Sequence, residues 1–395
     1  MTTSNFDWKD PFHFTEQLTQ EERIAQAELR KFCETHLRGH LQEVHRTGYD
    51  PGIIRELGRL GLLGSTIDGY GGAGASHVSY GIATRELERV DAGYRGILSV
   101  QGSLVMNSIF HFGSPAQKSA YLPKLATGEL IGCFGMTEPE HGSNPAAMET
   151  SAREIPGGYR LNGHKMWISF SPVADLFIIW AKLQGAGNGP AAVRGFILAK
   201  GAQGLEVRRI ADKVGLPNSS TGEVMLTDVF VPEDHLLPEA TGLTGPLATL
   251  SSARYGIAWG ALGAAEDCWM RARDYAMERK PFGRPLAQTQ LAQGKLATMQ
   301  SEIALGLQGC LRVGRLLDEG RGSAEMISLI KRNSCEKALQ IARMARDMHG
   351  GNGLRASYGI MHHVMNLEAD STYEGTHDIH SLVLGRSQTG LQAFY

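Results

Sequence analysis

The sequence predicts an α+β multi-domain chain with a helical N-terminal part, a middle β domain and a C-terminal bundle of long helices. Apolar residues recur at helical spacing in the first and last thirds, whereas the middle third has short apolar or alternating runs between turn residues. We place the parts at residues 1–127, 128–240 and 241–395. A chain of 395 residues can bury more than one core, which fits this division.

The first helix is predicted to begin at Thr19. Thr19 and Glu22 have the spacing of a capping box, and apolar Ile24, Leu29 and Phe32 follow without a helix breaker. Similar patterns recur to about residue 125, as in "GIIRELGRLGLLG" and "SYGIATRELERVD". The first third is therefore predicted to be all-helical.

The middle domain is predicted to be a sheet whose strands are joined by turns. Strand-like runs such as "YRLNGHKMWIS", "DLFIIWAKL" and "EVMLTDVFVP" are separated by Gly, Pro, Asn and Asp. Helices of 10–15 residues between the strands are lacking, and so are the G-x-G-x-x-G and P-loop motifs. A Rossmann fold is therefore disfavoured.

Long helices are predicted again after Gly245, at about 246–279, 288–318, 324–349 and 377–392. In the second of them an apolar stripe steps by three or four residues through Leu296, Met299, Ile303, Leu307, Cys310, Val313 and Leu317. Four such helices predict an antiparallel bundle.

Charge and cysteine usage exclude several classes of function. With 39 Lys and Arg against 41 Asp and Glu, the net charge of -2 gives no case for binding nucleic acid or an anionic membrane. Five widely spaced cysteines suggest neither disulfides nor a thiolate metal site, and no carboxylate or Cys completes a metal set with the 14 histidines. No apolar run approaches a membrane span, and the N-terminus resembles no signal or transit peptide, so a cytoplasmic location is expected.

One acidic residue in the stretch "STYEGTHDIHSLVLGR" is a candidate for chemistry. Glu374 stands between Tyr373 and Gly375. Burying an ionised carboxylate is costly unless the carboxylate is neutralised or hydrogen-bonded. Glu374 is therefore interpreted as a catalytic base or as an ordinary loop residue.

Three further segments have both a functional and a structural interpretation. "CFGMTEPEHGSNP" (133–145) is either a ligand-binding loop or a plain polar loop, and "KMWISFSP" (165–172) puts Trp167 and Ser169 either on a ligand or at the end of a core strand. The glycines of "DMHGGNG" (347–353) allow a close approach to a ligand or simply end a helix.

Arg95 lies in the otherwise apolar segment that follows Gly93. Its guanidinium is always charged, so it must meet water, a carboxylate or a phosphate. A structural ion pair with Glu88 is the alternative to a ligand contact.

Taken together, these segments resemble the acyl-CoA dehydrogenase family over essentially the whole chain. The resemblance rests on "GMTEPEHGSNP", "KMWIS", "ERKPFGRPL", "GGNG" and "YEGTHDIH". Within the family, "ELERVDAGYR", "SVQGSLVM", "SARYGIAWG" and "STYEGTHDIHSLVLGR" are most similar to the glutaryl-CoA dehydrogenase branch.

The resemblance implies FAD as the cofactor and Glu374 as the base that removes the α-proton of an acyl thioester, with hydride passing to the flavin. Glu374 would also donate its backbone N–H to the thioester oxygen, and Gly375 would let the substrate pass close by. The residues expected to hold the flavin and pyrophosphate are Phe134, Met136, Thr137, Gly142, Trp167, Ile168, Ser169 and Thr376. A neighbouring subunit of a homotetramer would complete the adenine end with Arg279, Phe282, Gln290, Gly350 and Gly351, and Asp347 is a further expected cofactor contact.

For the substrate, the resemblance implies contacts of Ser143, Leu250 and Arg254 with the CoA arm. Arg95, with Glu88 near it, would bind a distal carboxylate. Glutaryl-CoA would then be dehydrogenated and decarboxylated to crotonyl-CoA, with reprotonation by Glu374 beside Tyr373, and electrons would go to an electron-transfer flavoprotein.

Two alternatives stay open at this stage. A related enzyme would oxidise another carboxylated acyl thioester, on CoA or on an acyl-carrier protein, without the decarboxylation step. A protein of a different class would keep the fold and the flavin as a non-catalytic scaffold.

The sequence departs from the family pattern at five positions. Gly96 stands where the family has Ser after the Arg, Ser169 replaces Thr, and Phe170 replaces Asn. Pro217 replaces Arg and Pro281 replaces Gln. Gly96 and Phe170 bear on the acyl pocket, whereas the two prolines bear on loops and on FAD affinity.

Overall fold

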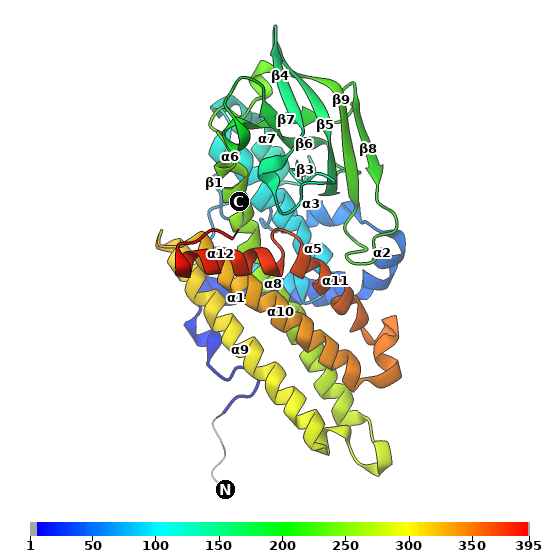
Figure 1. Ribbon diagram of the computed structural model, residues 1–395. Helices are drawn as coiled ribbons and strands as arrows, with labels where there is room; N and C mark the ends of the chain where they lie inside the picture. Colours follow the sequence, from blue (N-terminus) through cyan, green and yellow to red (C-terminus); the bar gives the residue numbers. More distant parts are fainter. Residues whose placement is uncertain (1–5, 394–395) are drawn as a thin grey trace. The chain divides into compact units, whose positions relative to one another are not determined.

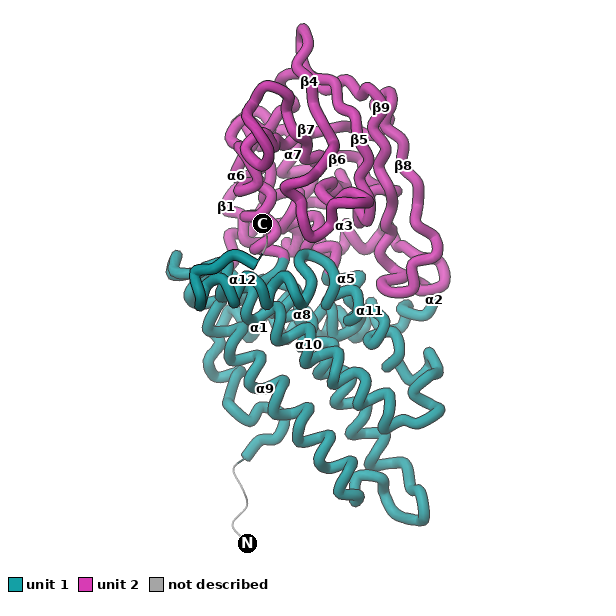
Figure 2. Tube along the Cα trace, in the orientation of Figure 1, with its two compact units in different colours: residues 1–43, 76–95, 254–395 teal, residues 44–75, 96–253 magenta. Residues whose placement is uncertain are grey.

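The computed structural model describes residues 6–393, and these form two compact units. Unit 1 comprises residues 1–43, 76–95 and 254–395, and unit 2 comprises residues 44–75 and 96–253 (Figure 2). Along the chain the elements run from helices through strands to helices, which confirms the predicted fold class (Figure 1). The exact domain boundaries stay predictions.

Unit 1 is helical. The predicted capping box is confirmed, because the Thr19 hydroxyl accepts from the Glu22 N–H at 3.2 Å and the Glu22 carboxylate accepts from the Thr19 N–H at 2.9 Å. The helices within it are α1 (Gln20–Phe32), α4 (His77–Glu88), α9 (Gln290–Asp318), α10 (Ala324–Met348), α11 (Met361–Thr372) and α12 (His377–Thr389). Most of α8 (Thr244–Glu278) also belongs to this unit.

The four predicted C-terminal helices correspond to α8, α9, α10 and α12, and α10 packs against α9, α11 and α12. Helix α11 was not predicted. Its buried face carries polar His362, His363, Asn366 and Asp370 beside Leu367, so the apolar stripe that signals a helix is interrupted.

Short helical turns complete unit 1. They are the 3-10 turns Phe14–Gln17, Arg38–His40, Pro281–Gly283, Leu286–Gln288, Gly350–Leu354 and Ala356–Tyr358, and the π-helical turn Cys33–Leu37.

The helices of unit 2 come before its strands. They are α3 (Pro51–Arg59), α6 (Asn107–Phe112), α7 (Pro115–Ala126) and the π-helical segment Leu98–Met106. Helices α2 (Leu41–Thr47) and α5 (Ala92–Ile97) run across the division between the units. The prediction of an all-helical first third is wrong in one detail, because β1 (Asp68–Gly69) and β2 (Gly72–Ala73) pair as a small hairpin whose turn needs Gly71 at φ 87°.

The rest of unit 2 is built around one seven-stranded sheet. Its strands are β3 (Gly132–Gly135), β4 (Ser151–Ile155), β5 (Gly158–Ser169), β6 (Leu176–Leu183), β7 (Val193–Ala199), β8 (Leu205–Arg209) and β9 (Thr221–Pro232). The order is β3-β6-β4-β5-β9-β8, and β7 pairs with β6. Two pairs that involve β6, those with β3 and β4, are parallel and the other pairs are antiparallel.

The core of unit 2 is made by the inward side chains of these strands, among them Leu161, Phe177, Ile179, Phe196 and Val229. The connections contain loops and the 3-10 turns Pro145–Ala147, Gly189–Ala192 and Glu233–His235, as the turn-joined prediction requires. Within residues 6–393, none of the helices is both long and apolar enough to cross a lipid bilayer.

Candidate active site

Glu374 lies in the short turn between α11 and α12. Its backbone has φ 52° and that of Gly375 has φ 94°. A left-handed conformation is unfavourable for glutamate and tends to persist only where the surroundings impose it, often at functional sites. The turn ends at Thr376, whose side chain caps α12 by accepting from the Ile379 N–H at 3.2 Å.

Two cations hold this turn through its main-chain carbonyl groups. Lys331 of α10 donates from Nζ to the carbonyl oxygens of Tyr373 at 3.0 Å and of Gly375 at 2.8 Å. Arg254 of α8 donates from Nε to the carbonyl oxygen of Glu374 at 2.6 Å. Three consecutive carbonyl groups are thus satisfied, which fixes the position of the Glu374 backbone.

The Glu374 side chain is set up to exchange a proton near neutral pH. In the part of the chain that the structure describes, its buried Oε2 has no hydrogen-bond partner. Burial raises the pKa of Glu374 to about 7, against the opposing charges of Arg95, Arg254 and Lys331.

His380 of α12 packs against the Gly375 backbone. A Cβ at position 375 would lie 2.8 Å from His380 Nε2, so only glycine fits there. The imidazole is buried, and burial lowers its pKa to about 3, so it is neutral beside Glu374.

Arg95 lies at the centre of a buried charge cluster. Its Nε donates to Glu88 Oε2 at 2.7 Å, which confirms the ion pair that was the structural alternative. A second carboxylate, Asp370 of α11, accepts from the Arg95 terminal nitrogen at 2.8 Å. The Tyr373 hydroxyl contacts both Arg95 and Asp370, and the three charged side chains are at most 1% exposed. We call Glu88, Arg95, Asp370 and Tyr373 the arginine cluster.

The arginine cluster holds two carboxylates against one cation. Burial and the negative charge of Asp370 raise the pKa of Glu88 well above its ordinary value, although Arg95 opposes this shift. Burial raises the pKa of Tyr373 as well, so its phenol stays protonated. The cluster is therefore close to electrically neutral when Glu88 carries a proton.

Two residues around the turn, Asp370 and Lys331, were not predicted from the sequence. Asp370 stands directly before the segment "STYEGTHDIHSLVLGR" that contains Glu374, and an acid on the buried face of a helix is a signal that could have been used. Lys331 is likewise buried on α10 among apolar residues. Their roles depend on contacts between distant parts of the chain, which a local pattern does not reveal.

In unit 2, Trp167 lies in a β-bulge of β5. The pairing with β9 shifts register between Lys165 and Ile168, and Trp167 has φ 62°. Its side chain is 53% exposed, so it is no part of a core, and the core alternative for this tryptophan is wrong. Ile168 is buried and Ser169 ends the strand.

A buried ion pair that was also not predicted connects two of the motifs. Lys165 Nζ lies 2.9 Å from Glu138 Oε1 and 3.0 Å from the Met136 carbonyl oxygen, and the Met166 N–H donates to the Thr137 carbonyl oxygen at 2.9 Å. Burial lowers the pKa of Lys165 to about 8, whereas Glu138 has its pKa lowered to about 2 by Lys165 and by hydrogen bonds, against the effect of burial. The pair fixes the segment Met136–Glu138 beside the bulge that exposes Trp167.

The other expected contact residues differ in how accessible they are. Gly142 and Ser143 are exposed in the loop after β3, Phe134 and Met136 are largely covered, and Leu250 is half-buried on α8. Asp347 is exposed, and so are all the residues expected to serve a neighbouring subunit: Arg279, Phe282, Gln290, Gly350 and Gly351.

In the glycine segment 347–353 at the end of α10, the two interpretations apply to different glycines. Gly350 follows the C-cap residue His349 at φ 56°, which confirms the helix-ending interpretation for this glycine. Gly351 has open space where a Cβ would stand, so packing does not require its glycine. Asp347 forms an ion pair with Lys295 at the surface.

Two of the five departures from the family pattern have a clear structural setting. Phe170 is buried within unit 2, where its ring centroid lies 5.9 Å from that of Tyr49. A Cβ at position 96 would have nothing within 4 Å, so a residue larger than Gly96 would fit there.

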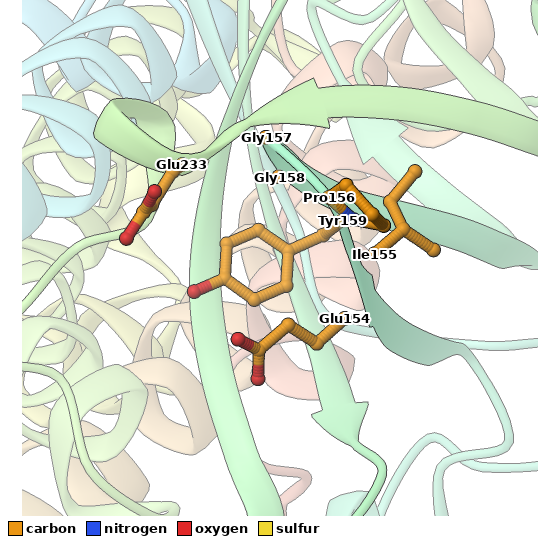
Figure 3. Close-up of a pocket in the computed structure, with 7 residues that line it drawn as sticks. All are labelled: Glu154, Ile155, Pro156, Gly157, Gly158, Tyr159 and Glu233. Atoms are coloured by element: carbon orange, nitrogen blue, oxygen red, sulfur yellow. The ribbon is translucent and has the colours of Figure 1, made fainter.

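A pocket of about 430 Å³ lies elsewhere in unit 2, at the turn between β4 and β5 (Figure 3). It is lined by Glu154, Ile155, Pro156, Gly157, Gly158, Tyr159 and Glu233. None of these belongs to the predicted motifs. The pocket is therefore distinct from the candidate site.

The residues present fit a flavin. Trp167 offers a flat exposed face on a fixed strand, and Gly142 and Gly351 have open space where a Cβ would stand. Unit 1, for its part, holds at Glu374 a carboxylate that titrates near neutrality, as an enzyme that removes a proton from a weakly acidic carbon requires.

Comparison with known proteins identifies the family. Three family models match in chain order: the acyl-CoA dehydrogenase N-terminal domain over residues 19–129, the middle domain over 133–229 and the C-terminal domain over 240–389.

Whole proteins match over nearly their full length. An acyl-CoA dehydrogenase of Bacillus subtilis is 33% identical over 94% of this chain and 99% of that protein. Among solved structures, a glutaryl-CoA dehydrogenase from Mycobacterium smegmatis in complex with FADH2 is 41% identical, with a TM-score of 0.95 over 99% of this chain and 100% of the other. Butyryl-CoA dehydrogenase from Megasphaera elsdenii is 31% identical, with a TM-score of 0.89 over 94% and 98%.

The chain therefore belongs to the acyl-CoA dehydrogenase family, as its motifs predicted. It is an oxidoreductase that acts on acyl-CoA thioesters, and its cofactor is FAD.

Proposed function

We propose that the chain is a decarboxylating glutaryl-CoA dehydrogenase, which converts glutaryl-CoA to crotonyl-CoA and CO2. The observation that carries this proposal is the buried Arg95 guanidinium, which contacts the Tyr373 hydroxyl one residue before Glu374. A fixed cation near the base suits a substrate with a carboxylate at its far end. The 41% identity to a glutaryl-CoA dehydrogenase over nearly the whole chain supports the same substrate.

Glu374 is the catalytic base in this proposal. The α-hydrogen of an acyl thioester is weakly acidic, so a desolvated carboxylate with a pKa near 7 is suited to remove it. Lys331 and Arg254 bind the carbonyl oxygens of the turn and so hold the Glu374 N–H in a fixed direction, where it would donate to the thioester oxygen. FAD supplies the acceptor for the hydride.

Decarboxylation follows from the electronic structure of the first product. Loss of CO2 from the unsaturated acyl group leaves a carbanion that is delocalised into the thioester, and the γ-carbon then needs one proton. Glu374 holds the proton that it took from the α-carbon and delivers it to the γ-carbon. The proton balance of the acyl group is thereby closed.

The cofactor and the assembly belong to the same proposal. Trp167 and Ser169 would contact the isoalloxazine, the segment Phe134–Thr137 with Gly142 would hold it, and Thr376 would lie near the pyrophosphate. The residues expected to serve the adenine of a neighbouring subunit in a homotetramer are exposed, which suits that role: Arg279, Phe282, Gln290, Gly350 and Gly351. An electron-transfer flavoprotein would receive the electrons.

A second candidate is a dehydrogenase for another carboxylated acyl thioester, on CoA or on an acyl-carrier protein. The open space at Gly96 favours it, because a bulkier acyl group would find room beside Arg95. In that case CO2 need not be released.

The test is anaerobic mixing of the FAD-loaded enzyme with glutaryl-CoA and, separately, with butyryl-CoA. We expect glutaryl-CoA to bleach the flavin absorbance at low concentration and to release one CO2 per flavin reduced, and butyryl-CoA to require a much higher concentration. Bleaching without CO2 would favour the second candidate, and equal responses to the two thioesters would contradict a carboxylated substrate. No bleaching with any acyl thioester would indicate a non-catalytic flavoprotein.

A further inference from the structure

The arginine cluster has one more carboxylate than its cation can balance. Arg95 faces both Glu88 and Asp370, at 2.7 and 2.8 Å, and both carboxylates are fully buried. A substrate carboxylate at Arg95 would be the third anion around one guanidinium. Burying an uncompensated charge is costly, so the cluster must change its protonation when such a substrate binds.

The two carboxylates have places for additional protons. In the part of the chain that the structure describes, Glu88 Oε1 and Asp370 Oδ2 are buried and have no hydrogen-bond partner. Unpartnered buried oxygen atoms are rare, because each loses its hydrogen bonds to water without replacement. Protonation of a carboxylate removes its charge and so lowers this cost.

We propose that Glu88 and Asp370 together form a proton-accepting pair that takes up one proton from solvent when an acyl carboxylate binds at Arg95. This inference rests on the proposed function, because it needs a substrate with a distal carboxylate. In the free enzyme Glu88 carries a proton, and Asp370 balances Arg95. On binding, the pair takes up a second proton, and the substrate carboxylate becomes a partner of Arg95.

The cycle balances without any further reactant. The proton comes from solvent to the pair on binding and returns to solvent when the product, which no longer has that carboxylate, leaves. The pair determines specificity in this scheme, because one of its two possible negative charges must be neutralised before an anionic acyl group can bind at Arg95. A neutral acyl group makes no such demand.

Further titratable groups lie around the cluster and the turn beside it. Lys331 and Cys335 on α10 and Glu374 in the turn interact electrostatically with members of the cluster, whereas Arg254 on α8 and His380 on α12 lie beside the Glu374 turn. Burial raises the pKa of Cys335 to about 12 and lowers that of His380 to about 3, so neither titrates near neutrality. Glu374 does titrate near neutrality, so the experiment below is carried out with the Glu374→Gln variant.

Protons taken up on binding can be counted by isothermal titration calorimetry in buffers with different ionisation enthalpies. The enzyme is the FAD-loaded Glu374→Gln variant, which binds thioesters without turnover and has no titrating base. The ligands are glutaryl-CoA and its γ-amide, which has the same length and no charge. At pH 7.5 we expect about one proton per subunit with glutaryl-CoA and none with the amide, so that Kd for glutaryl-CoA weakens about tenfold per pH unit.

The assignment to these two residues is tested in the same background. Adding Glu88→Gln with Asp370→Asn should abolish proton uptake and tighten the binding of glutaryl-CoA, while the affinity for the amide changes little. The matched control is Glu86→Gln on the same helix as Glu88. The Glu86 carboxylate pairs with Arg30 at 2.8 Å and not with Arg95, so this variant should leave the uptake at about one proton.

If the combined variant loses its FAD, the wild-type enzyme provides the second measurement. The ratio of KM for glutaryl-CoA to KM for the amide should rise about tenfold per pH unit between pH 7 and 9. Equal proton uptake with the two ligands, uptake that persists in the combined variant, or a ratio independent of pH would overturn the proton-accepting pair and leave glutaryl-CoA as the substrate. Failure of glutaryl-CoA to bind where the amide binds would overturn both proposals.

Discussion

The Nε–H of Arg254 donates to the main-chain carbonyl oxygen of Glu374 over 2.6 Å, so a charged side chain is fixed to the backbone of the proposed base. Its positive charge also lowers the pKa of Glu374 against the larger effect of burial. Arg254 therefore acts on the position of the base and on its proton affinity together.

Replacement of Arg254 by Gln should raise the pKa of Glu374 above its present value of about 7. Because the base must be ionised to act, the acidic limb of the kcat/KM profile should move to higher pH. Activity at pH 7 should fall about tenfold for each unit by which the pKa rises, and it should recover in alkali. Arg312→Gln is the control, since Arg312 pairs with Glu319 on the surface. If KM rose equally at all pH values and the acidic limb of the kcat/KM profile did not move, Arg254 would have no effect on the pKa of Glu374 and would act only through its expected contact with CoA.

The Glu374→Gln variant should keep its FAD and lose substrate-driven flavin reduction. An amide cannot accept the α-proton, and general-base catalysis is typically worth about 10²–10⁴-fold. Stopped-flow absorbance with glutaryl-CoA measures the rate. Reduction at more than about a hundredth of the wild-type rate would mean that another residue removes the proton.

The same variant should be more stable than the wild type at neutral pH. The folded-state pKa of Glu374 is about 7, above its ordinary 4.5, so ionising it in the folded protein costs free energy. This penalty is absent below about pH 4.5, grows as the pH rises to 7 and stays constant above, reaching up to roughly 3 kcal/mol. Thermal unfolding across this range should show Tm values of the two proteins diverging as pH rises, and parallel curves would contradict the raised pKa.

Local patterns in the sequence were sufficient for the helices with an uninterrupted apolar stripe, for the turn-joined strands and for the Glu374 motif. They were insufficient where stability depends on distant partners. Arg95 and Asp370 are 275 positions apart and Lys165 and Glu138 are 27 apart, so neither ion pair leaves a periodic signal. Helix α11 was missed for the same reason, because polar residues on its buried face are stabilised by partners from distant parts of the chain.

Replacement of Lys165 by Met should destabilise unit 2 and weaken FAD binding. The substitution leaves Glu138 buried without its cation, which typically costs about 3–5 kcal/mol, and frees the segment that lies beside Trp167. Denaturant unfolding and FAD release measure the two effects. Arg160→Met on the same strand is the control, because its ion pair with Asp228 is exposed and should be worth less than about 1 kcal/mol. Equal losses in the two variants would show that the buried pair has no special role.

Phe282→Ser should weaken subunit association and FAD retention together. Phe282 is fully exposed at φ 56° in the turn Pro281–Gly283, a position that costs free energy unless another molecule covers the ring. Analytical ultracentrifugation should show a tetramer that dissociates at higher concentration than the wild type. Val214→Ser is the control. Val214 is also strongly exposed, but it lies in unit 2 and is not one of the residues expected to contact a neighbouring subunit's adenine. A wild-type protein that is monomeric with tightly held FAD would contradict the proposed assembly.

Two glycines of one segment should respond in opposite ways to replacement by alanine. At Gly375 the backbone has φ 94°, and a Cβ would meet His380 Nε2 at 2.8 Å, so Gly375→Ala must shift the buried imidazole or the Glu374 turn. We expect a loss of stability of about 1–3 kcal/mol and a fall in kcat of about 10²-fold, because a displacement of about 1 Å at a base is enough for such a loss. Gly385 lies within α12 with open space around it, and Gly385→Ala should stabilise the protein by up to about 1 kcal/mol with activity unchanged. Thermal unfolding and steady-state kinetics measure both variants. If Gly375→Ala retained full activity, the left-handed turn would not be needed to hold Glu374, and the positioning roles of Lys331 and Arg254 would lose their basis.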